Sequence, residues 1–365
     1  MTDGIARKIA RRIRAEGPLT VAAYMAMALH DPVGGYYARR DPIGAGGDFT
    51  TAPEISQIFG ELIGLWCAEL WQRTGWRDPV VLAELGPGHG VLMSDFLRAA
   101  GAVPGFRRAL RLYLVESSLV LRIEQEKRLR HAQPHWVTRI EDLPDGPMLL
   151  IANEFLDALP IRQLVRRNTH WSERMVGLDL EDRLVFVDGP ESPMGTLFVP
   201  KSLRHCAPGT IVEICPAALT LAHVLAARLA CQPGAALFID YGCFPSAPGP
   251  TLRAVRQHRP VSALAAPGTA DLSAHVDFAA FAEAARAGGA TTHGPALQRR
   301  FLAALGVEQR LVALCARATP TQHQALESGV RRLLDSEGMG DLFKVMALVS
   351  PGLPPPLGFD ANADR

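Results

Sequence analysis

The clearest pattern in this chain is an apolar run that ends at an acid and then turns at three alternating glycines. Residues 80–85 are aliphatic apart from one glutamate, and Gly86, Gly88 and Gly90 follow. After them, residues 91–100 place apolar side chains three and four positions apart, which is the spacing of a helix. The sequence therefore predicts a buried strand, a glycine turn and a helix.

Three further apolar runs have the length of buried strands: residues 110–115, 148–152 and 235–242. Continuous apolar runs of this kind are typical of parallel sheets that are covered on both faces. From residue 79 to about 160 these runs alternate with helical spacing, which indicates an α/β fold. We therefore predict a Rossmann-like sheet with helices on both faces.

The rest of the chain divides into segments by pattern and composition. The expected segments are a helical N-terminal part with a glycine-rich interruption (1–78), the core (79–245) with short alternating strands inserted as a β-meander (about 162–214), a Pro-, Gly- and Ala-rich excursion or lid (246–300), the C-terminal part of the core (301–350) and a mobile Pro-rich tail (351–365). No internal repeat is present in the sequence.

The first residues predict an amphipathic surface helix. Ile5, Ile9 and Ile13 repeat every four residues among arginines, so that they share one face. An Arg-rich presequence is the other interpretation of this pattern, and Asp3 and Glu16 argue against it.

Composition narrows the class of protein. Of the 365 residues, 48% are hydrophobic and 21% charged, and the net charge is +1, so we expect a substantial core and no attraction to nucleic acid. The six cysteines are scattered without a Cys-x-x-Cys pair, which predicts free thiols in a reducing compartment and no metal site. No apolar stretch is long enough to span a membrane, and no secretory leader is expected.

The glycine turn favours one class of nucleotide cofactor. Alternate glycines let the backbone approach a ligand closely, and the next helix directs free N–H groups at it. Dinucleotide-binding loops read Gly-x-Gly-x-x-Gly, but here the third glycine comes one residue early. Glu84 would repel a pyrophosphate and suits a cationic or hydroxyl-bearing ligand.

The pattern Glu-x-Gly-x-Gly-x-Gly after a strand resembles the first motif of S-adenosylmethionine-dependent methyltransferases. The candidate cofactor contacts in it are Glu84, Gly86, Pro87, Gly88 and Gly90. A glycine turn that binds no ligand is the simpler alternative.

Two acids further along the chain are candidates for the nucleoside. Glu116 follows the run 110–115, at about the distance downstream where an acid pairs with ribose hydroxyls in such sheets. One carboxylate can accept from both hydroxyls, although a solvated acid at a strand end is an equally simple interpretation. Asp142 lies where methyltransferases often place a residue near the adenine.

The strand expected at 148–152 leads into a polar segment, Asn153–Pro160. Ligands of open α/β sheets bind beyond the carboxyl ends of the strands, so we expect Asn153, Glu154 and Asp157 beside the reactive end of the cofactor. For Glu154, a helix N-terminal position favoured by the helix dipole is the structural alternative. Asp240, at the end of another strand, is expected to line the same cleft.

Longer motifs carry a more specific resemblance, and they occur in order over nearly the whole chain. They are residues 47–57, 84–90, 153–160, 239–242, 270–278 and 339–344. Together they resemble the MidA-like family of class I methyltransferases, which includes a mitochondrial assembly factor that acts on an arginine of a core subunit of respiratory complex I. The resemblance implies S-adenosylmethionine as cofactor and protein arginine methylation, with symmetric dimethylarginine as product.

Arginine methylation requires acids at the acceptor site. The guanidinium has a pKa of roughly 12.5 to 13.8 and stays protonated, so its nitrogen is a poor nucleophile until carboxylates hold and polarise it. Glu154 and Asp157, three residues apart at an expected helix start, are placed to share one face and grip the guanidinium donors. Methyl transfer then depends mainly on alignment of nitrogen, methyl carbon and sulfur.

Residues 47–57 combine polar side chains with nearby glycines, which is typical of a loop that closes over a cofactor. We interpret this segment as a lid, with Asp48 and Thr50 as candidate cofactor contacts. Helix capping explains part of the same polarity. His275 and Asp277 are candidate substrate contacts, with a structural histidine and a helix cap as the alternatives.

Other functions stay open at this point. A nicotinamide oxidoreductase is disfavoured by the glycine spacing and by the lack of a recognisable Tyr-x-x-x-Lys pair. An assembly chaperone that keeps the cofactor fold without catalysing is a third class. Within the methyltransferases, a lysine or a small molecule is the alternative acceptor, because acids beside a sulfonium also suit an amine.

The partner expected from the resemblance is a protein, with a complex I core subunit as the first candidate. The sequence names neither the methylated protein nor its arginine, and it leaves the oligomeric state open, a homodimer included. We expect a cytoplasmic location for a bacterial chain and the mitochondrial matrix for a eukaryotic one.

Overall fold

The computed structural model describes residues 3–39, 44, 48 and 50–359. The chain divides into two compact units. The first unit comprises residues 1–49, 156–222 and 242–284, and the second comprises residues 50–155, 223–241 and 285–365. Residues 47 and 49 of the expected lid lie outside the described residues.

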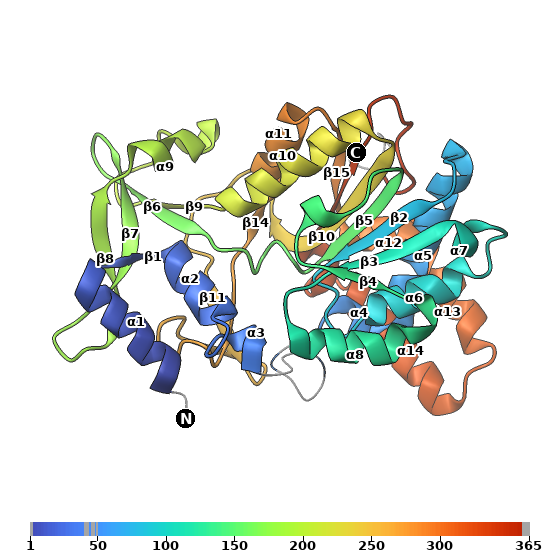
Figure 1. Ribbon diagram of the computed structural model, residues 1–365, viewed down its shortest axis with the longest axis horizontal. Helices are drawn as coiled ribbons and strands as arrows, with labels where there is room; N and C mark the ends of the chain where they lie inside the picture. Colours follow the sequence, from blue (N-terminus) through green and yellow to red (C-terminus); the bar gives the residue numbers. More distant parts are fainter. Residues whose placement is uncertain (1–2, 40–43, 45–47, 49, 360–365) are drawn as a thin grey trace. The chain divides into compact units, whose positions relative to one another are not determined.

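The second unit is built on the α/β sheet (Figure 1). Its strands are β2 (Val80–Leu85), β3 (Leu110–Val115), β4 (His135–Val137), β5 (Met148–Asn153), β10 (Gly234–Cys243), β15 (Thr291–Leu297) and β16 (Phe343–Val349), in the order β15-β16-β10-β5-β2-β3-β4. Strands β10, β5, β2, β3 and β4 are parallel, and β16 is antiparallel to both of its neighbours. The predicted Rossmann-like sheet is confirmed.

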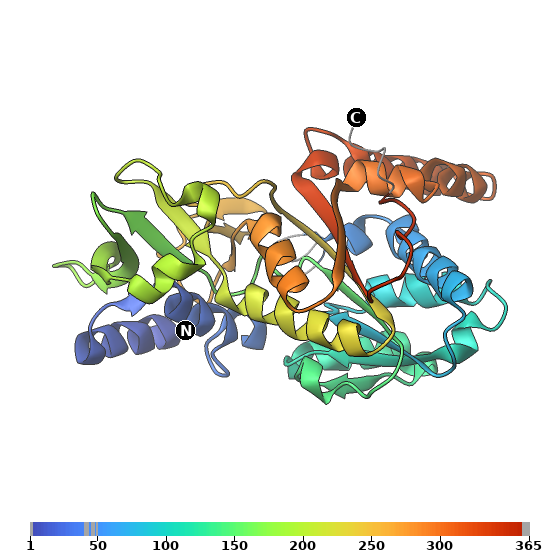
Figure 2. The same ribbon diagram turned by 90° about the horizontal axis from the view of Figure 1, so that it is seen from above.

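Helices cover both faces of this sheet. They include α4 (Ala52–Ile55), α5 (Gln57–Thr74), α6 (Val91–Ala100), α7 (Phe106–Ala109), α8 (Leu119–Leu129), α10 (Pro216–Cys231), α12 (Gln298–Ala304), α13 (Val307–Cys315), α14 (Pro320–Leu334) and α15 (Met339–Leu342). Figure 2 shows α10, in yellow, on one side of the strands and α5, in blue, on the other.

The period-2 alternation of the strands decides which side chains meet the α5 face. Alternate residues of β5 and β10, among them Leu149, Ile151, Leu237 and Ile239, join one buried cluster with Trp66 of α5. The residues between them point to the opposite face. Both sets are buried, which explains why these strands read as continuous apolar runs in the sequence.

Close packing between α5 and α6 depends on two glycines. A Cβ at Gly60 would lie 2.8 Å from the Leu92 carbonyl oxygen, and one at Gly64 would lie 2.8 Å from the Phe96 carbonyl oxygen. Backbone atoms cannot give way as a flexible side chain can, so both positions exclude any larger residue.

The segment after Pro351 makes packing contacts, as far as it is described. The indole N–H of Trp66 donates to the Leu357 carbonyl oxygen at 3.0 Å, and the rings of Phe301 and Phe359 lie 5.4 Å apart. Proline-rich composition therefore does not prevent apolar residues of this segment from packing, and the mobility of the tail stays a prediction.

The first unit combines the N-terminal helices with the meander. Its elements are α1 (Asp3–Glu16), β1 (Leu19–Thr20), α2 (Val21–His30), α3 (Tyr36–Arg39), β6 (Arg162–Arg166), β7 (Trp171–Leu178), β8 (Leu184–Glu191), α9 (Pro193–Phe198), β9 (Ile211–Ile214), β11 (Arg253–Arg256), β12 (Arg259–Val261), β13 (Asp271–Ser273), β14 (Val276–Asp277) and α11 (Phe278–Ala287). One antiparallel sheet has the order β1-β7-β6-β9 with β8 on β7, and a second has the order β12-β11-β13. The inserted meander is thus an antiparallel sheet.

Long-range pairing explains why the two units are not continuous in sequence. Strand β1 pairs with β7, so that Leu19 lies opposite Val176, and this joins the N-terminal segment to the meander. Ile5, Ile9 and Ile13 of α1 are at most 7% exposed, which confirms the amphipathic helix.

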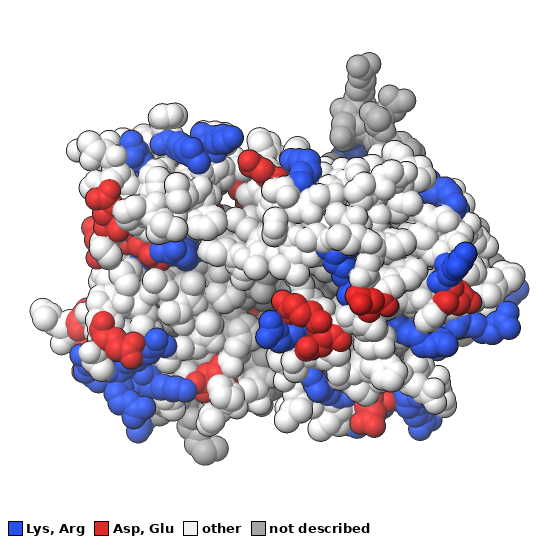
Figure 3. Space-filling view, turned by 45° about the horizontal axis from the view of Figure 1, so that its top comes forward, with Lys and Arg blue, Asp and Glu red and all other residues white. Residues whose placement is uncertain are grey.

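On the face in Figure 3, acidic and basic side chains lie side by side. Within residues 3–39, 44, 48 and 50–359, no helix is long and apolar enough to cross a membrane, and no group of three or more His, Cys, Asp or Glu is arranged to hold a metal ion. The six cysteines lie in the described part of the chain, and none of them forms a disulfide.

We expect Gly64→Leu to lower the free energy of unfolding by about 1 to 3 kcal/mol, because overpacking outweighs the better helix propensity of leucine. Urea denaturation followed by circular dichroism measures this. Leu65→Ala is the matched control, since Leu65 is 39% exposed on the same helix. Equal stability of Gly64→Leu and the wild type would contradict the packing described for α5 and α6.

Candidate active site

The glycine turn joins the carboxyl end of β2 to α6 and uses left-handed backbone at each glycine. The φ angles are +60° at Gly86, +53° at Gly88 and +73° at Gly90, a region that other residues rarely adopt. A Cβ at Gly86 would also lie 2.8 Å from the Phe155 ring. Pro87 closes the turn by accepting the Gly90 N–H at 2.8 Å, so the loop presents backbone rather than side chains.

Glu84 lies on β2 just before the turn and is buried. Its Oε2 atom has no hydrogen-bond partner among the described residues. Burial, with a smaller contribution from the charge of Glu116, raises the pKa of Glu84 to about 8. A buried acceptor without a partner is costly, so this atom fits a site where a ligand supplies the missing donor.

Glu116 follows β3 and is tied to the glycine turn through one side chain. Its Oε1 accepts the Ser118 N–H at 2.7 Å. Gln125 of α8 donates from Nε2 to Oε2 of Glu116 at 3.2 Å and to the Gly88 carbonyl oxygen at 2.8 Å. Burial raises the pKa of Glu116, while these hydrogen bonds oppose the rise.

Gln125 is a site residue that the sequence analysis missed. It is fully buried, and Trp136 fixes its orientation by donating to its Oε1 at 2.8 Å. The available signal was its place in the apolar stripe of α8, between Leu121 and Leu129. A polar residue within such a stripe requires partners, and here the partners are the cofactor-loop backbone and Glu116.

Asn153 and Glu154 lie where β5 ends. Glu154 has φ +50°, so its backbone is held in a strained conformation of the kind that gathers at functional sites. Its Oε1 accepts the Ala52 N–H at 3.0 Å and the Asn153 Nδ2 at 3.2 Å. Asn153 Oδ1 is buried and has no partner in the described part of the chain.

Asp240 of β10 supports this turn rather than standing open to solvent. It is 1% exposed, and its carboxylate accepts the Phe155 N–H at 3.1 Å and the Tyr241 N–H at 2.9 Å. The Glu154 N–H donates to the Ile239 carbonyl oxygen at 2.9 Å. Direct contact between Asp240 and a substrate stays a prediction.

Sheet register brings these residues to one edge. Leu85 lies opposite Val115 on one side and Ala152 on the other, and Asn153 lies opposite Ile239. The carboxyl ends of β3, β2, β5 and β10 are therefore adjacent, and the strand order reverses between β2 and β5. Ligands of open α/β sheets bind at such a point.

Of the segment expected to be a lid, residues 48 and 50–57 are described. Thr50 is half-buried just before α4. Besides the Ala52 contact with Glu154, Glu54 Oε1 lies 2.9 Å from Nδ1 of His89, a residue to which the sequence assigned no role. Helix α4 thus contacts both the glycine turn and the acidic turn, and closure over a cofactor stays a prediction.

Asp157 and Asp48 belong to the first unit, in a buried acidic cluster with Asp271. The hydroxyl of Tyr36 donates to Asp48 at 2.8 Å and that of Tyr37 donates to Asp271 at 2.9 Å. Burial and then the charge of Asp157 raise the pKa of Asp271 to about 8. Asp271 lies inside one of the family motifs but was not singled out, since spacing alone did not place it beside Asp157.

The remaining candidates have local roles. Asp142 is exposed on a short 3-10 helix of the second unit. Asp277 accepts the Ser246 hydroxyl and the Ala280 N–H, both at 2.9 Å, which supports the helix-cap interpretation. The backbone N–H of His275 donates to the Thr251 hydroxyl oxygen at 2.8 Å. Substrate contact by His275 or Asp277 is not tested by these bonds.

The raised pKa of Glu84 predicts a pH dependence of stability in the cofactor-free protein. The folded protein keeps the proton up to pH of about 8, whereas the unfolded chain releases it near the ordinary glutamate pKa of 4.5. The free energy of unfolding therefore falls as pH rises between these values, by roughly 1.4 kcal/mol for each pH unit. Glu84→Gln should lose less stability than the wild type between pH 5 and pH 8 in urea titrations. If the stability of Glu84→Gln and of the wild type changed with pH in parallel, Glu84 would not have the raised pKa of a buried carboxyl group without a partner.

Known proteins resemble this chain over nearly its full length. A family model for S-adenosyl-L-methionine-dependent methyltransferases matches residues 62–296. Protein arginine methyltransferase NDUFAF7, mitochondrial, from Danio rerio is 36% identical over 96% of this chain and 88% of its own length. The Homo sapiens protein of the same name is 35% identical over 94% of this chain and 82% of its own length.

A solved structure agrees with the sequence relatives. A Burkholderia thailandensis protein in complex with S-adenosyl-homocysteine has a TM-score of 0.84 and 28% identity, and the match covers 100% of this chain and 96% of that one. The relatives named mitochondrial fit the location expected for a eukaryotic member, whereas no comparison supports a cytoplasmic one. The chain belongs to the MidA-like family of class I S-adenosylmethionine-dependent methyltransferases.

Proposed function

We propose that this methyltransferase acts on arginine side chains of a protein. The relatives named protein arginine methyltransferases support this. The observation that carries the proposal is the strained Glu154, whose carboxylate is oriented by Ala52 and Asn153 beside the glycine turn. Backbone strain of this kind persists only where the surrounding structure holds it in place, and it is concentrated at active sites.

The cofactor fits the residues at the sheet edge. The unpartnered Oε2 of Glu84 and the glycine backbone offer a buried acceptor and a close approach. We assign Glu84 and the turn Gly86–Gly90 to the cofactor, and Glu116, held by Gln125, to its ribose hydroxyls. Bound S-adenosylmethionine supplies an electrophilic methyl group on a sulfonium.

The acceptor chemistry is the work of the chain's own acids. Two hydrogen-bond donors, the Ala52 N–H and the Asn153 side chain, fix the orientation of the Glu154 carboxylate. In this orientation Glu154 pairs with the substrate guanidinium and orients one of its nitrogens. It also takes the proton that the nitrogen releases on methylation. Asp157, three residues further along the chain, is proposed as the second acid that holds the guanidinium donors.

The finer proposals rest on the family resemblance. A core subunit of respiratory complex I is the proposed substrate, and symmetric dimethylarginine the proposed product. Mass spectrometry of complex I from cells with and without this chain tests both, through a methylated arginine that disappears with the chain. Sedimentation of the purified chain tests the proposed homodimer.

Gly86→Val should abolish binding of S-adenosyl-homocysteine in isothermal titration calorimetry, because valine cannot adopt the φ of +60° and its Cβ would meet Phe155. Gly75→Ala is the matched control, since Gly75 also has positive φ but a Cβ there has no atom within 4 Å. Retained affinity in Gly86→Val would remove the cofactor assignment.

Glu154→Gln should lower kcat by about 10²- to 10⁴-fold, the range for loss of a general base, while the Kd of S-adenosyl-homocysteine stays within about threefold of the wild type. Tritium transfer from labelled S-adenosylmethionine to arginine peptides measures kcat. Glu126→Gln, on the exposed side of α8, serves as control. An unchanged kcat in Glu154→Gln would exclude Glu154 from the acceptor site.

A further inference from the structure

The short helix α4 contacts the site at two points. Its first N–H, on Ala52, donates to Oε1 of Glu154 at 3.0 Å. Oε1 of Glu54, on the same helix, lies 2.9 Å from Nδ1 of His89 in the glycine turn. All four residues belong to the second unit. One turn of helix therefore joins the proposed acceptor acid to the proposed cofactor loop.

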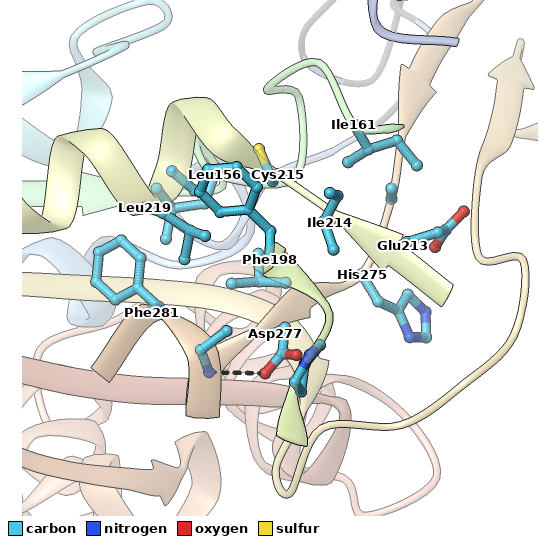
Figure 4. A pocket seen from close by; sticks show the side chains of 15 residues that line it. Leu156, Ile161, Phe198, Glu213, Ile214, Cys215, Leu219, His275, Asp277 and Phe281 are labelled. Atoms are coloured by element: carbon cyan, nitrogen blue, oxygen red, sulfur yellow. Dashed lines mark hydrogen bonds between the residues drawn. The ribbon is translucent and has the colours of Figure 1, made fainter. Parts of the chain in front are cut away.

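The contact between Ala52 and Glu154 is not a local capping bond. Asp277 shows the local arrangement: it accepts the N–H of Ala280 at the start of α11, which follows it directly, and Figure 4 draws this bond as a dashed line. Glu154 instead accepts from a residue 102 positions away in the chain. The orientation of the Glu154 carboxylate therefore depends in part on what holds α4.

A helix of four residues does not hold itself in place. One turn fixes several backbone angles for very few hydrogen bonds, so an isolated helix of this length is unstable in water. On one side α14 supports α4, since a Cβ at Gly329 would lie 2.9 Å from the Ile55 carbonyl oxygen. On the side of the glycine turn, the contact between Glu54 and His89 supports it.

The contact between Glu54 and His89 is sheltered from water. The side chains are 21% and 14% exposed, whereas those of Glu327 and His323, another Glu–His pair of this unit, are 52% and 47% exposed. Carboxylate oxygens accept hydrogen bonds, so Nδ1 of His89 carries the hydrogen. A sheltered polar contact holds its partners more firmly than an exposed pair does.

The glycine turn has further bonds that do not involve this pair. The Gly86 N–H donates to the Val115 carbonyl oxygen at 3.1 Å, and the Gly88 carbonyl oxygen accepts from Gln125 at 2.8 Å. These bonds fix the turn to β3 and α8. His89 is therefore the fixed partner of the contact, and α4 is the element that the contact positions.

We propose that Glu54 and His89 are positioning residues for methyl transfer, because their contact holds α4 where the Ala52 N–H orients the Glu154 carboxylate. This role rests on the proposed function of Glu154. Without the contact, α4 shifts and the carboxylate with it, while the cofactor still binds to the turn. A misplacement of about 1 Å at a reacting group costs on the order of 10²-fold in rate.

The test compares variants of Glu54 in the full chain. Glu54→Ala removes the contact, whereas Glu54→Gln keeps an oxygen that accepts from Nδ1 of His89. Glu327→Ala is the matched control, since it breaks the exposed Glu–His pair of the same unit. Tritium transfer from labelled S-adenosylmethionine to arginine peptides gives kcat, and isothermal titration calorimetry gives the Kd of S-adenosyl-homocysteine.

Glu54→Ala is expected to lower kcat by about 10- to 100-fold, with the Kd of S-adenosyl-homocysteine within about threefold of the wild type. Glu54→Gln should keep kcat within about threefold of the wild type, and Glu327→Ala should leave kcat unchanged. The unchanged Kd separates a misplaced carboxylate from a damaged fold.

A combination with Glu154→Gln tests whether Glu54 acts through Glu154. If it does, adding Glu54→Ala to Glu154→Gln lowers kcat no further, because the group that the contact positions is already lost. A merely structural role of Glu54 would lower kcat by the same factor in both backgrounds. For the same reason His89→Ala should match Glu54→Ala, and the double variant should lose no more than either single one.

The results that would overturn the proposal differ in what else they overturn. An unchanged kcat in Glu54→Ala, equal losses in Glu54→Ala and Glu54→Gln, or a full further loss on top of Glu154→Gln excludes the positioning role but leaves arginine methylation standing. A Kd weakened as strongly as kcat assigns the contact to the cofactor site instead. Methylation of no arginine peptide by a wild type that binds S-adenosyl-homocysteine overturns the proposed function and the positioning role together.

Discussion

The backbone turn at Glu154 is the constraint on which the site depends. A glutamate with φ +50° is unfavourable on its own, so neighbouring groups must hold it there. The Ile239 carbonyl oxygen and the Asp240 carboxylate bind the N–H groups of Glu154 and Phe155. Pairing of β5 with β10 thus aims the carboxylate of Glu154, and the Phe155 ring in turn leaves room only for glycine at position 86.

Uncompensated buried polar atoms mark the other half of the site. Glu84 Oε2 and Asn153 Oδ1 lack hydrogen-bond partners among the described residues. At the same edge of the sheet, by contrast, Gln125 donates hydrogen bonds to Glu116 and to the Gly88 carbonyl oxygen of the glycine turn. Hydrogen bonds orient Glu116, but Glu84 keeps a buried acceptor atom without a partner. Because buried polar atoms are normally hydrogen-bonded, this arrangement indicates a ligand-binding site. The raised pKa of Glu84 has the same physical origin.

Local pattern was enough to predict the sheet, the glycine turn and the acids that end its strands, because alternation and turn residues act over a few positions. The strain at Glu154, the bracing by Asp240 and the bridging by Gln125 depend on pairing between distant strands and helices, so no window of sequence contained them. The same holds for the two units: β1 and β7 are far apart in the chain, and only their pairing joins the N-terminal helices to the meander. Composition did not reveal the contacts of residues 351–359, where prolines precede a phenylalanine that packs against Phe301.

The most direct test of the account is a crystal structure of the chain with S-adenosyl-homocysteine. The account predicts the ligand against the turn Gly86–Gly90, with its ribose hydroxyls on Glu116 and with Glu84 Oε2 bonded to the ligand or to a water that it orders. A ligand bound elsewhere, or Glu84 still without a partner in the complex, would contradict it.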